Sequence, residues 1–233
     1  MIYILAVSDE TALYDTPVDF PQVDMLLSCG DLAPYYLSFL VDRYMPAVRI
    51  MIHGNHDGAY FTDGQQPVNL QYSEVFSGMF SIVNGIHVLS FEDYDFLDED
   101  LTIGGFSGIS AYGDQPFYHS DFSLSQFKAK LMLKKSFSSF SGADIMLSHA
   151  PPDFGLITCG EGDHRPSEKL AALNELLGAK LWLYGHIHRR YTSSDLDFLT
   201  RNGAPLNLIN ACPFQYFSYD QKTGDIEFLH AAE

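Results

Sequence analysis

Apolar runs of strand length alternate with polar segments from the start of the chain. Ile2–Val7, Met25–Ser28 and residues 48–52 are almost continuously apolar, which is typical of strands buried on both faces. Residues 35–44 lie between the last two runs and have apolar side chains at helical spacing. The order strand, strand, helix, strand predicts a parallel sheet at the beginning of the chain.

The middle of the chain has shorter apolar segments. Residues 81–83, 86–90 and 101–106 are rich in β-favouring residues, and Asn84-Gly85 between the first two predicts a hairpin. Residues 114–121 are expected to form a loop. Residues 123–137 have the pattern of an amphipathic helix, with Ser123 as its expected N-cap.

The last third of the chain returns to the first pattern. A strand is expected at 143–147, a helix at 167–177 with Ser167 as N-cap and Gly178 at its end, and a strand at 180–184. Three further β segments, at 206–209, 213–219 and 226–229, close the chain. We find no repeat, low-complexity segment or linker, so we expect a single domain over residues 1–233.

Polar clusters follow five of these predicted strands. The clusters are Asp9; Asp31; Asn55 with His56; His149; and His186 with His188. Ligands of open α/β sheets bind beyond the carboxyl ends of the strands, so these side chains are expected to converge. Each alone has a simpler interpretation as a turn, cap or surface residue. Their joint occurrence favours a metal site, and carboxylate, amide and imidazole donors suit Mn, Fe, Zn, Co or Ni.

Composition narrows the possible partners and compartments. The 233 residues carry 13 basic and 30 acidic side chains, a net charge of −17, which makes nucleic acid an unlikely partner. No apolar run is long enough to span a bilayer, so no membrane association is expected. The three cysteines are widely spaced and the N-terminus does not look like a signal peptide, which favours the cytoplasm.

Taken together, these motifs resemble the calcineurin-like metallophosphoesterase superfamily. The resemblance covers nearly the whole chain and is carried by Asp9, Gly30-Asp31, Gly54-Asn55-His56-Asp57, His149 and Gly185-His186-Ile187-His188, in that order. It implies an α/β protein with a four-layer α/β/β/α sandwich. It also implies a site for one or two divalent transition metal ions.

The resemblance assigns a role to each residue. Asp31 is similar to the carboxylate that bridges two metals. The other ligands would be Asp9 and His188 for the first metal, and Asn55, His149 and His186 for the second. His56 would act on the leaving group without binding metal, and Asp57 would orient its imidazole.

One position departs from the family pattern. The first motif is usually Asp-x-His, but this chain has Asp9-Glu10-Thr11. Thr11 lacks a strong donor, so the first metal is expected to bind more weakly than the second. Glu10, His119 and His164 are the candidates to fill the vacancy. Glu10 would face away from Asp9 on a regular strand, but a loop could turn it inward.

The expected reaction is hydrolysis of a phosphomonoester or phosphodiester, with a small or nucleotide-like substrate attacked by a metal-bound hydroxide. No GxSxG or Walker sequence points to a competing chemistry. Two alternatives stay open. The chain could be a non-catalytic metal-binding scaffold, since Thr11 replaces a ligand, or a nuclease, against which its acidic charge counts.

Overall fold

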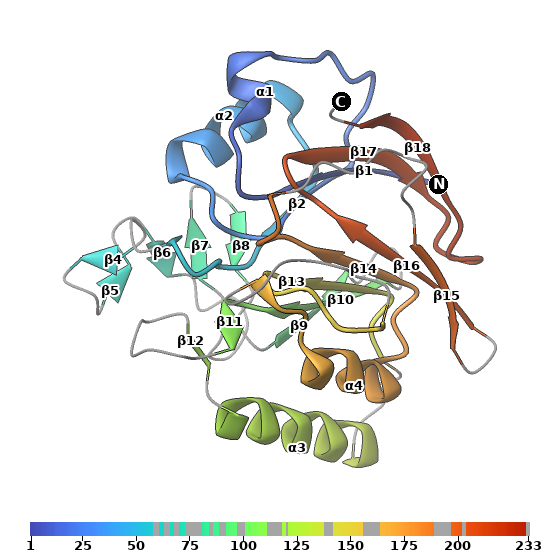
Figure 1. Ribbon diagram of the computed structural model, residues 1–233. Coiled ribbons are helices and arrows are strands. Elements are labelled where there is room, and N and C mark those ends of the chain that lie inside the picture. Colours follow the sequence, from blue (N-terminus) through green and yellow to red (C-terminus); the bar gives the residue numbers. More distant parts are fainter. Residues whose placement is uncertain are drawn as a thin grey trace.

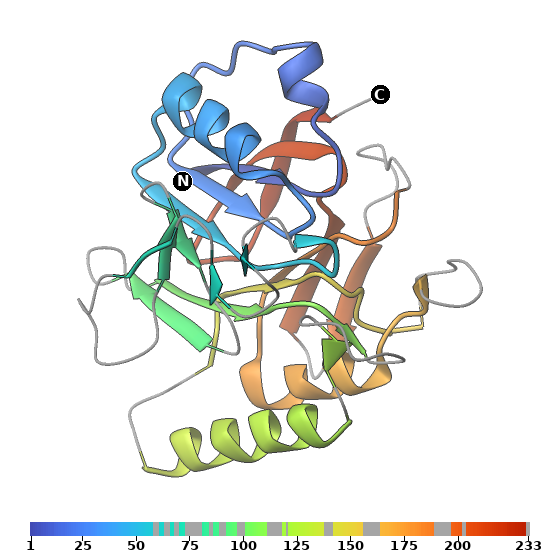
Figure 2. The same cartoon turned by 90° about the vertical axis from the view of Figure 1, so that its left-hand side faces the viewer.

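The computed structural model describes residues 1–57, 61–62, 66–67, 70–72, 81–83, 86–88, 92–96, 101–110, 118–119, 121–137, 142–155, 164–188, 197–201 and 204–231. Two mixed sheets lie face to face, and helices cover the outer face of each (Figures 1 and 2). The predicted four-layer α/β/β/α sandwich is therefore confirmed. No helix in these ranges is long and apolar enough to cross a membrane.

The first sheet contains the N-terminal strands and the C-terminal ones. In spatial order its strands are β18 (Ile226–Ala231), β17 (Phe214–Tyr219), β1 (Ile2–Val7), β2 (Met25–Ser28), β3 (Val48–Met51), β8 (Ile86–Val88), β7 (Ser81–Val83) and β6 (Leu70–Tyr72). Strands β1, β2, β3 and β8 are parallel. The pairing of β7 with β8 is antiparallel, as the Asn-Gly pair predicts.

The second sheet is built from the later part of the chain. In spatial order its strands are β15 (Asp197–Arg201), β16 (Ala204–Asn210), β14 (Leu181–Tyr184), β13 (Ile145–Ser148), β10 (Leu101–Phe106) and β9 (Glu92–Phe96). Strands β16, β14, β13 and β10 are parallel. Two small sheets pair β4 (Phe61–Thr62) with β5 (Gln66–Pro67), and β11 (Ile109–Ser110) with β12 (Tyr118–His119).

The apolar residues explain why the layers stack in this order. Ile4 and Ala6 of β1 join a core between the two sheets, together with Ile145 and Leu183. Their neighbours in β1 belong to a second core, which lies under α1 (Ala12–Asp15) and α2 (Pro34–Tyr44). A third core joins the second sheet to α3 (Asp121–Phe137) and α4 (Glu168–Leu177). A strand that contributes to two cores must be apolar on both faces, as its sequence is.

The helix ends confirm one expectation and correct another, and part of one expected loop is a strand. The Ser167 hydroxyl accepts a hydrogen bond from the Leu170 N–H at 3.3 Å, and Gly178 ends α4 with φ 65°. Helix α3 begins at Asp121, so Ser123 lies inside it and is not its N-cap. Residues 118–119, expected in a loop, form β12, where they pair with β11.

Candidate metal centre

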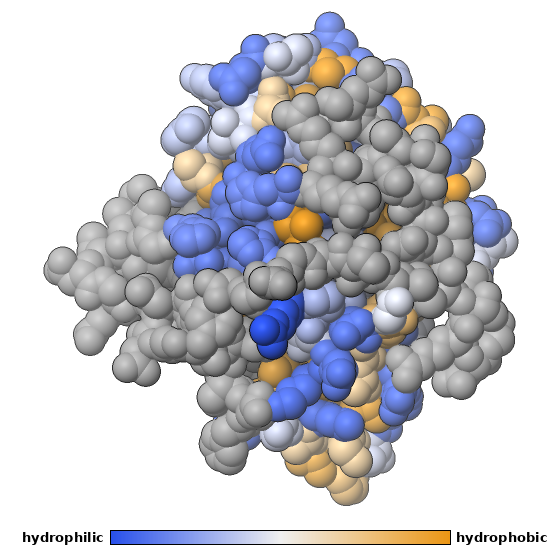
Figure 3. Space-filling view, in the orientation of Figure 1, coloured by the Kyte–Doolittle hydropathy of each residue, from blue (hydrophilic) through white to orange (hydrophobic). Residues whose placement is uncertain are grey.

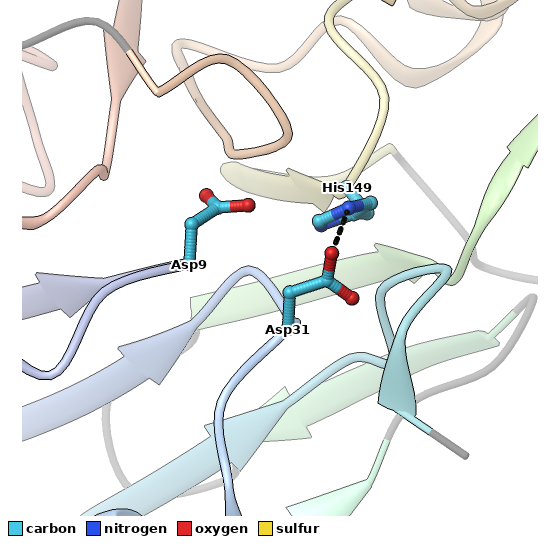
Figure 4. Close-up of side chains that lie close together, drawn as sticks. All are labelled: Asp9, Asp31 and His149. Atoms are coloured by element: carbon cyan, nitrogen blue, oxygen red, sulfur yellow. Dashed lines mark ion pairs between the residues drawn. The ribbon is translucent and has the colours of Figure 1, made fainter. Parts of the chain in front are cut away.

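The two sheets bring their carboxyl ends to a common edge. Asp9 and Asp31 lie just beyond β1 and β2, while His149 and His186 lie just beyond β13 and β14. Oxygen and nitrogen atoms of Asp9, Asp31 and His149 lie within 4.8 Å of one another. Figure 4 shows these three side chains pointing toward one another from separate strands. In Figure 3, hydrophilic residues gather across the middle of the face that lies between the two helical layers.

Sharp backbone turns direct the side chains at this edge. Asp9, Asp31 and His186 have φ values of 64°, 56° and 67°. A left-handed conformation costs a residue other than glycine about 1–2 kcal/mol. Such strain gathers at functional sites, where the surrounding structure enforces it. Each turn ends the regular alternation of side-chain direction along the preceding strand. A residue that follows the turn can therefore point to either side.

Two glycines let neighbouring loops approach more closely than a side chain would permit. A Cβ atom on Gly54 would lie 2.1 Å from the Asp31 Oδ1 atom. A Cβ atom on Gly185 would lie 2.0 Å from the Ser8 hydroxyl oxygen and 2.9 Å from the Asp9 Oδ2 atom. The glycines of the Gly-Asn-His-Asp and Gly-His-x-His motifs therefore make room for the two carboxylates.

His149 is the centre of the contacts. Its ring is fully buried, and its Nδ1 atom lies 2.7 Å from the Cys29 carbonyl oxygen, which only accepts hydrogen bonds. Its Nε2 atom lies 2.9 Å from Asn55 Oδ1 and 3.2 Å from Asp31 Oδ2. The side-chain oxygens of Asn55 and Asp31 therefore both face the Nε2 atom of His149, from the loops after β3 and β2.

Burial and charged neighbours shift the pKa values of His149, Asp31 and Asp9. Burial acts to lower the pKa of His149, but the hydrogen bond and charge of Asp31, the charge of Asp9 and the Cys29 carbonyl raise it to about 9. Burial likewise acts to raise the pKa of Asp31, yet contacts with His149 and His56 bring it below its ordinary value. For Asp9, burial prevails and raises the pKa. Two carboxylates are thus held beside one imidazolium, in a place that favours positive charge.

Asp31 is held by three groups. Its Oδ1 atom accepts a hydrogen bond from the His56 N–H at 2.7 Å, and its Oδ2 atom faces His149. Its own N–H donates to the Asp57 Oδ2 atom at 3.0 Å, which also accepts from the Gly54 N–H at 2.7 Å. The buried Asp57 carboxylate therefore joins the loop after β2 to the loop after β3.

The opposite side of the site is organised around Asp9. Its carboxylate is buried and accepts a hydrogen bond from the His186 N–H, at 3.1 Å to Oδ1 and 3.0 Å to Oδ2. The His188 Nε2 atom lies 3.7 Å from Asp9 Oδ1. The His186 ring meets the His149 ring edge-on, with centroids 5.0 Å apart. Contacts thus link all six residues expected to bind metal.

Four further residues singled out in the sequence have different positions. The exposed His56 stands beside Asp31 and is joined to it by its backbone. The exposed His164 stacks on the His186 ring, with centroids 4.7 Å apart and planes 22° apart, so it reaches the site. His119 lies in β12. Thr11 is the N-cap residue of α1, and its carbonyl oxygen accepts a hydrogen bond from Tyr14.

The residues present fit a divalent transition metal. The oxygens of two aspartates and an asparagine, together with imidazole nitrogens, form the mixed donor set that such ions accept. In the contact between His149, Asn55 and Asp31, a cation would replace the proton shared by one nitrogen and two oxygens. Two contacts were not foreseen from the sequence. Asp57 binds backbone N–H groups of two loops, and Glu10 lies 4.0 Å from the ring of His188.

Comparison with known proteins shows what this chain is similar to. A model of the calcineurin-like phosphoesterase family matches residues 8–190. One crystal structure aligns over 99% of both chains with a TM-score of 0.58 and 10% identity. The protein TT1561 of Thermus thermophilus aligns over 97% of both chains with a TM-score of 0.52 and 11% identity. Phosphopantetheinyl hydrolase (PptH) of Mycobacterium tuberculosis aligns over 89% of this chain and 88% of its own, with a TM-score of 0.48 and 13% identity.

At such identities the two better-aligned structures show a shared fold and nothing finer. A search of curated proteins found no match to this sequence. The family model, in contrast, spans most of the chain and includes every residue of the candidate metal centre. The chain therefore belongs to the calcineurin-like phosphoesterase family.

Proposed function

We propose that this protein hydrolyses a phosphomonoester or phosphodiester of a small molecule, with one or two divalent transition metal ions at the described site. The family supports metal-dependent phosphoester hydrolysis in general. The observation that carries the proposal is the position of His149, whose Nε2 atom faces Asn55 Oδ1 at 2.9 Å and Asp31 Oδ2 at 3.2 Å.

The ligands divide between two positions in this proposal. Asp31 would be shared, Asp9 and His188 would complete the first position, and Asn55, His149 and His186 the second. Divalent cations held there would lower the pKa of a bound water and neutralise the phosphate charge. The backbone hydrogen bonds to Asp31 and Asp9 keep both carboxylates oriented before any ligand arrives.

His56 is the proposed general acid. Its backbone N–H donates a hydrogen bond to Asp31. The residue itself is exposed, so its imidazole can reach an entering ester. In the reaction, water loses a proton to solvent and its oxygen bonds to phosphorus, the ester P–O bond breaks, and protonated His56 delivers a proton to the departing oxygen. A positioned acid of this kind contributes about 10²–10⁴-fold to the rate.

Two further parts of the proposal concern the class of substrate and the cellular compartment. The net charge of −17 disfavours polyanions, so we propose a small or nucleotide-like substrate in preference to nucleic acid. Cys29 is a buried cysteine outside any disulfide, which fits a reducing compartment and hence the cytoplasm.

The test is turnover by the purified protein. Aryl phosphomonoesters and phosphodiesters are offered with Mn²⁺, Ni²⁺ or Co²⁺, and we expect hydrolysis that a chelator stops. His149→Ala supplies the matched inactive variant. If the protein binds metal but turns over no member of a broad substrate panel, the scaffold alternative replaces the enzyme.

A further inference from the structure

Glu10 lies beside the candidate metal centre. It follows Asp9, whose φ of 64° ends the alternation of β1, and its N–H donates to the Ser8 carbonyl oxygen at 2.7 Å. This tight turn brings Glu10 back toward the site. Its Oε1 atom lies 4.0 Å from His188 Nδ1 and 3.9 Å from the sulfur of Cys212, which is the donor in that contact.

His188 therefore stands between two carboxylates. Its Nε2 atom lies 3.7 Å from Asp9 Oδ1, and its Nδ1 atom faces Glu10. A neutral imidazole has one nitrogen with a lone pair for a metal and one nitrogen with a hydrogen. In metal sites the second nitrogen almost always donates to a carboxylate, carbonyl or water, which fixes the tautomer and the ring orientation.

The geometry does not favour Glu10 as a direct ligand. Glu10 faces the His188 nitrogen that does not face Asp9, so His188 lies between Glu10 and Asp9. It contacts a candidate ligand from the side away from the candidate metal position.

We propose that Glu10 is a positioning residue for His188, an inference that rests on the proposed function. Glu10 holds the hydrogen of His188 on Nδ1 and so leaves the Nε2 lone pair free beside Asp9 for the first metal. The distance of 4.0 Å exceeds a hydrogen bond of about 2.7–3.2 Å, so the proposal requires the ring and the carboxylate to approach each other by roughly 1 Å. Glu10 thereby compensates in part for the histidine that Thr11 replaces.

The first measurement needs no metal. Nitrogen-15 spectra of the metal-free protein, at a pH where neutral imidazole dominates, report the tautomer of His188, with its signals assigned through His188→Ala. The Asp9 carboxylate beside Nε2 is the same in every variant, so we expect a larger fraction of the Nδ1–H form in the wild type and in Glu10→Gln, which keeps an acceptor oxygen, than in Glu10→Ala. Glu227→Ala removes an equal charge from β18, at the register of Tyr3 rather than Asp9, and should match the wild type.

The second measurement is calorimetric titration of each metal-free variant with Zn²⁺. Loss of a residue that orients a ligand typically costs about 10–100-fold in metal affinity. We expect Glu10→Ala to weaken one binding step by this factor and leave the other unchanged, with Glu10→Gln nearer to the wild type.

Two results would overturn the inference. An unaltered tautomer and unaltered affinity in Glu10→Ala would show that Glu10 does not act on His188. Equal weakening in Glu10→Gln and Glu10→Ala with an unaltered tautomer would make Glu10 a direct ligand. Failure of the proposed function looks different, because a wild type that binds Zn²⁺ but hydrolyses no ester still gives both readouts for Glu10.

Discussion

Replacement of Asp57 with alanine removes one acceptor that serves two loops. The Asp57 Oδ2 atom accepts hydrogen bonds from the Gly54 N–H at 2.7 Å and the Asp31 N–H at 3.0 Å. The residue is only 3% exposed, so water cannot readily take its place. We therefore expect Asp57→Ala to lower both the stability of the fold and the affinity for metal.

The magnitude follows from the two donors. A buried N–H left without a partner costs about 1–3 kcal/mol, so two of them cost about 2–6 kcal/mol in Asp57→Ala. Asp57→Asn keeps an acceptor oxygen but loses its charge. Hydrogen bonds to charged groups contribute about 1 kcal/mol more than neutral ones, so this variant should lose about 1–3 kcal/mol.

The assay is urea unfolding of the metal-free protein in excess chelator, followed by metal analysis of the folded variants. Asp144→Ala is the matched control. Its carboxylate also accepts a backbone hydrogen bond, from the Thr102 N–H at 3.0 Å, but it precedes β13 and so lies at the other end of the sheet from His149. We expect this control to lose stability and to keep its metal.

The reasoning fails if Asp57→Ala unfolds at the wild-type urea concentration with an unchanged dependence on denaturant. A second outcome separates two roles. Should turnover fall while stability and metal content stay at wild-type values, Asp57 would act on the His56 imidazole, as the family resemblance implies, and not through the backbone of two loops.

Three further predictions concern the same site. His56→Ala should lower turnover about a hundredfold or more with metal content unchanged, whereas Asp31→Ala should lose both; metal analysis beside kinetics decides this. Gly54→Ala places a Cβ atom 2.1 Å from Asp31 Oδ1, so calorimetry should show weaker metal binding, and wild-type affinity would mean that the loops can separate freely. Thr11→His should strengthen the weaker of two Mn²⁺ binding steps, because it adds a nitrogen donor; two equally tight steps in the wild type would contradict the expected weak position.

Much of the fold was predictable because its central strands are buried on both faces. Ile2–Val7 and Met25–Ser28 are strands in the structure with the bounds that their apolar runs predict. The edge strand β9 was not predicted, because Glu92, Asp93 and Asp95 interrupt the apolar pattern that signals a strand. Helix α1 spans only four residues, too few for a helical period to show in the sequence.

The candidate site divides in a similar way. The polar residues at the ends of the predicted strands indicated which side chains would gather at the site, because the carboxyl ends of parallel strands share an edge of the sheet. The sequence could not predict which way Glu10 turns, because that depends on the left-handed conformation of Asp9. Nor did it indicate that Asp57 binds the backbone of Asp31, since the contact joins loops 26 residues apart. The sequence therefore predicted which residues gather at the site, but not the backbone reversals or the contacts between loops.

The places of the candidate ligands in the fold bear on the effect of Thr11, which stands where the family pattern has a histidine. Three candidate ligands follow strands of the first sheet, namely Asp9, Asp31 and Asn55, and three histidines follow strands of the second. An apolar core between the sheets fixes their separation, and it includes Ile4 of β1 and Leu183 of β14. Thr11, in contrast, stands at the N-cap position of α1, where its side chain makes no capping hydrogen bond, and it belongs to neither sheet. Its identity can therefore change while the core keeps the remaining candidate ligands in place, so we expect the change to weaken one proposed metal position and to leave the framework around both intact.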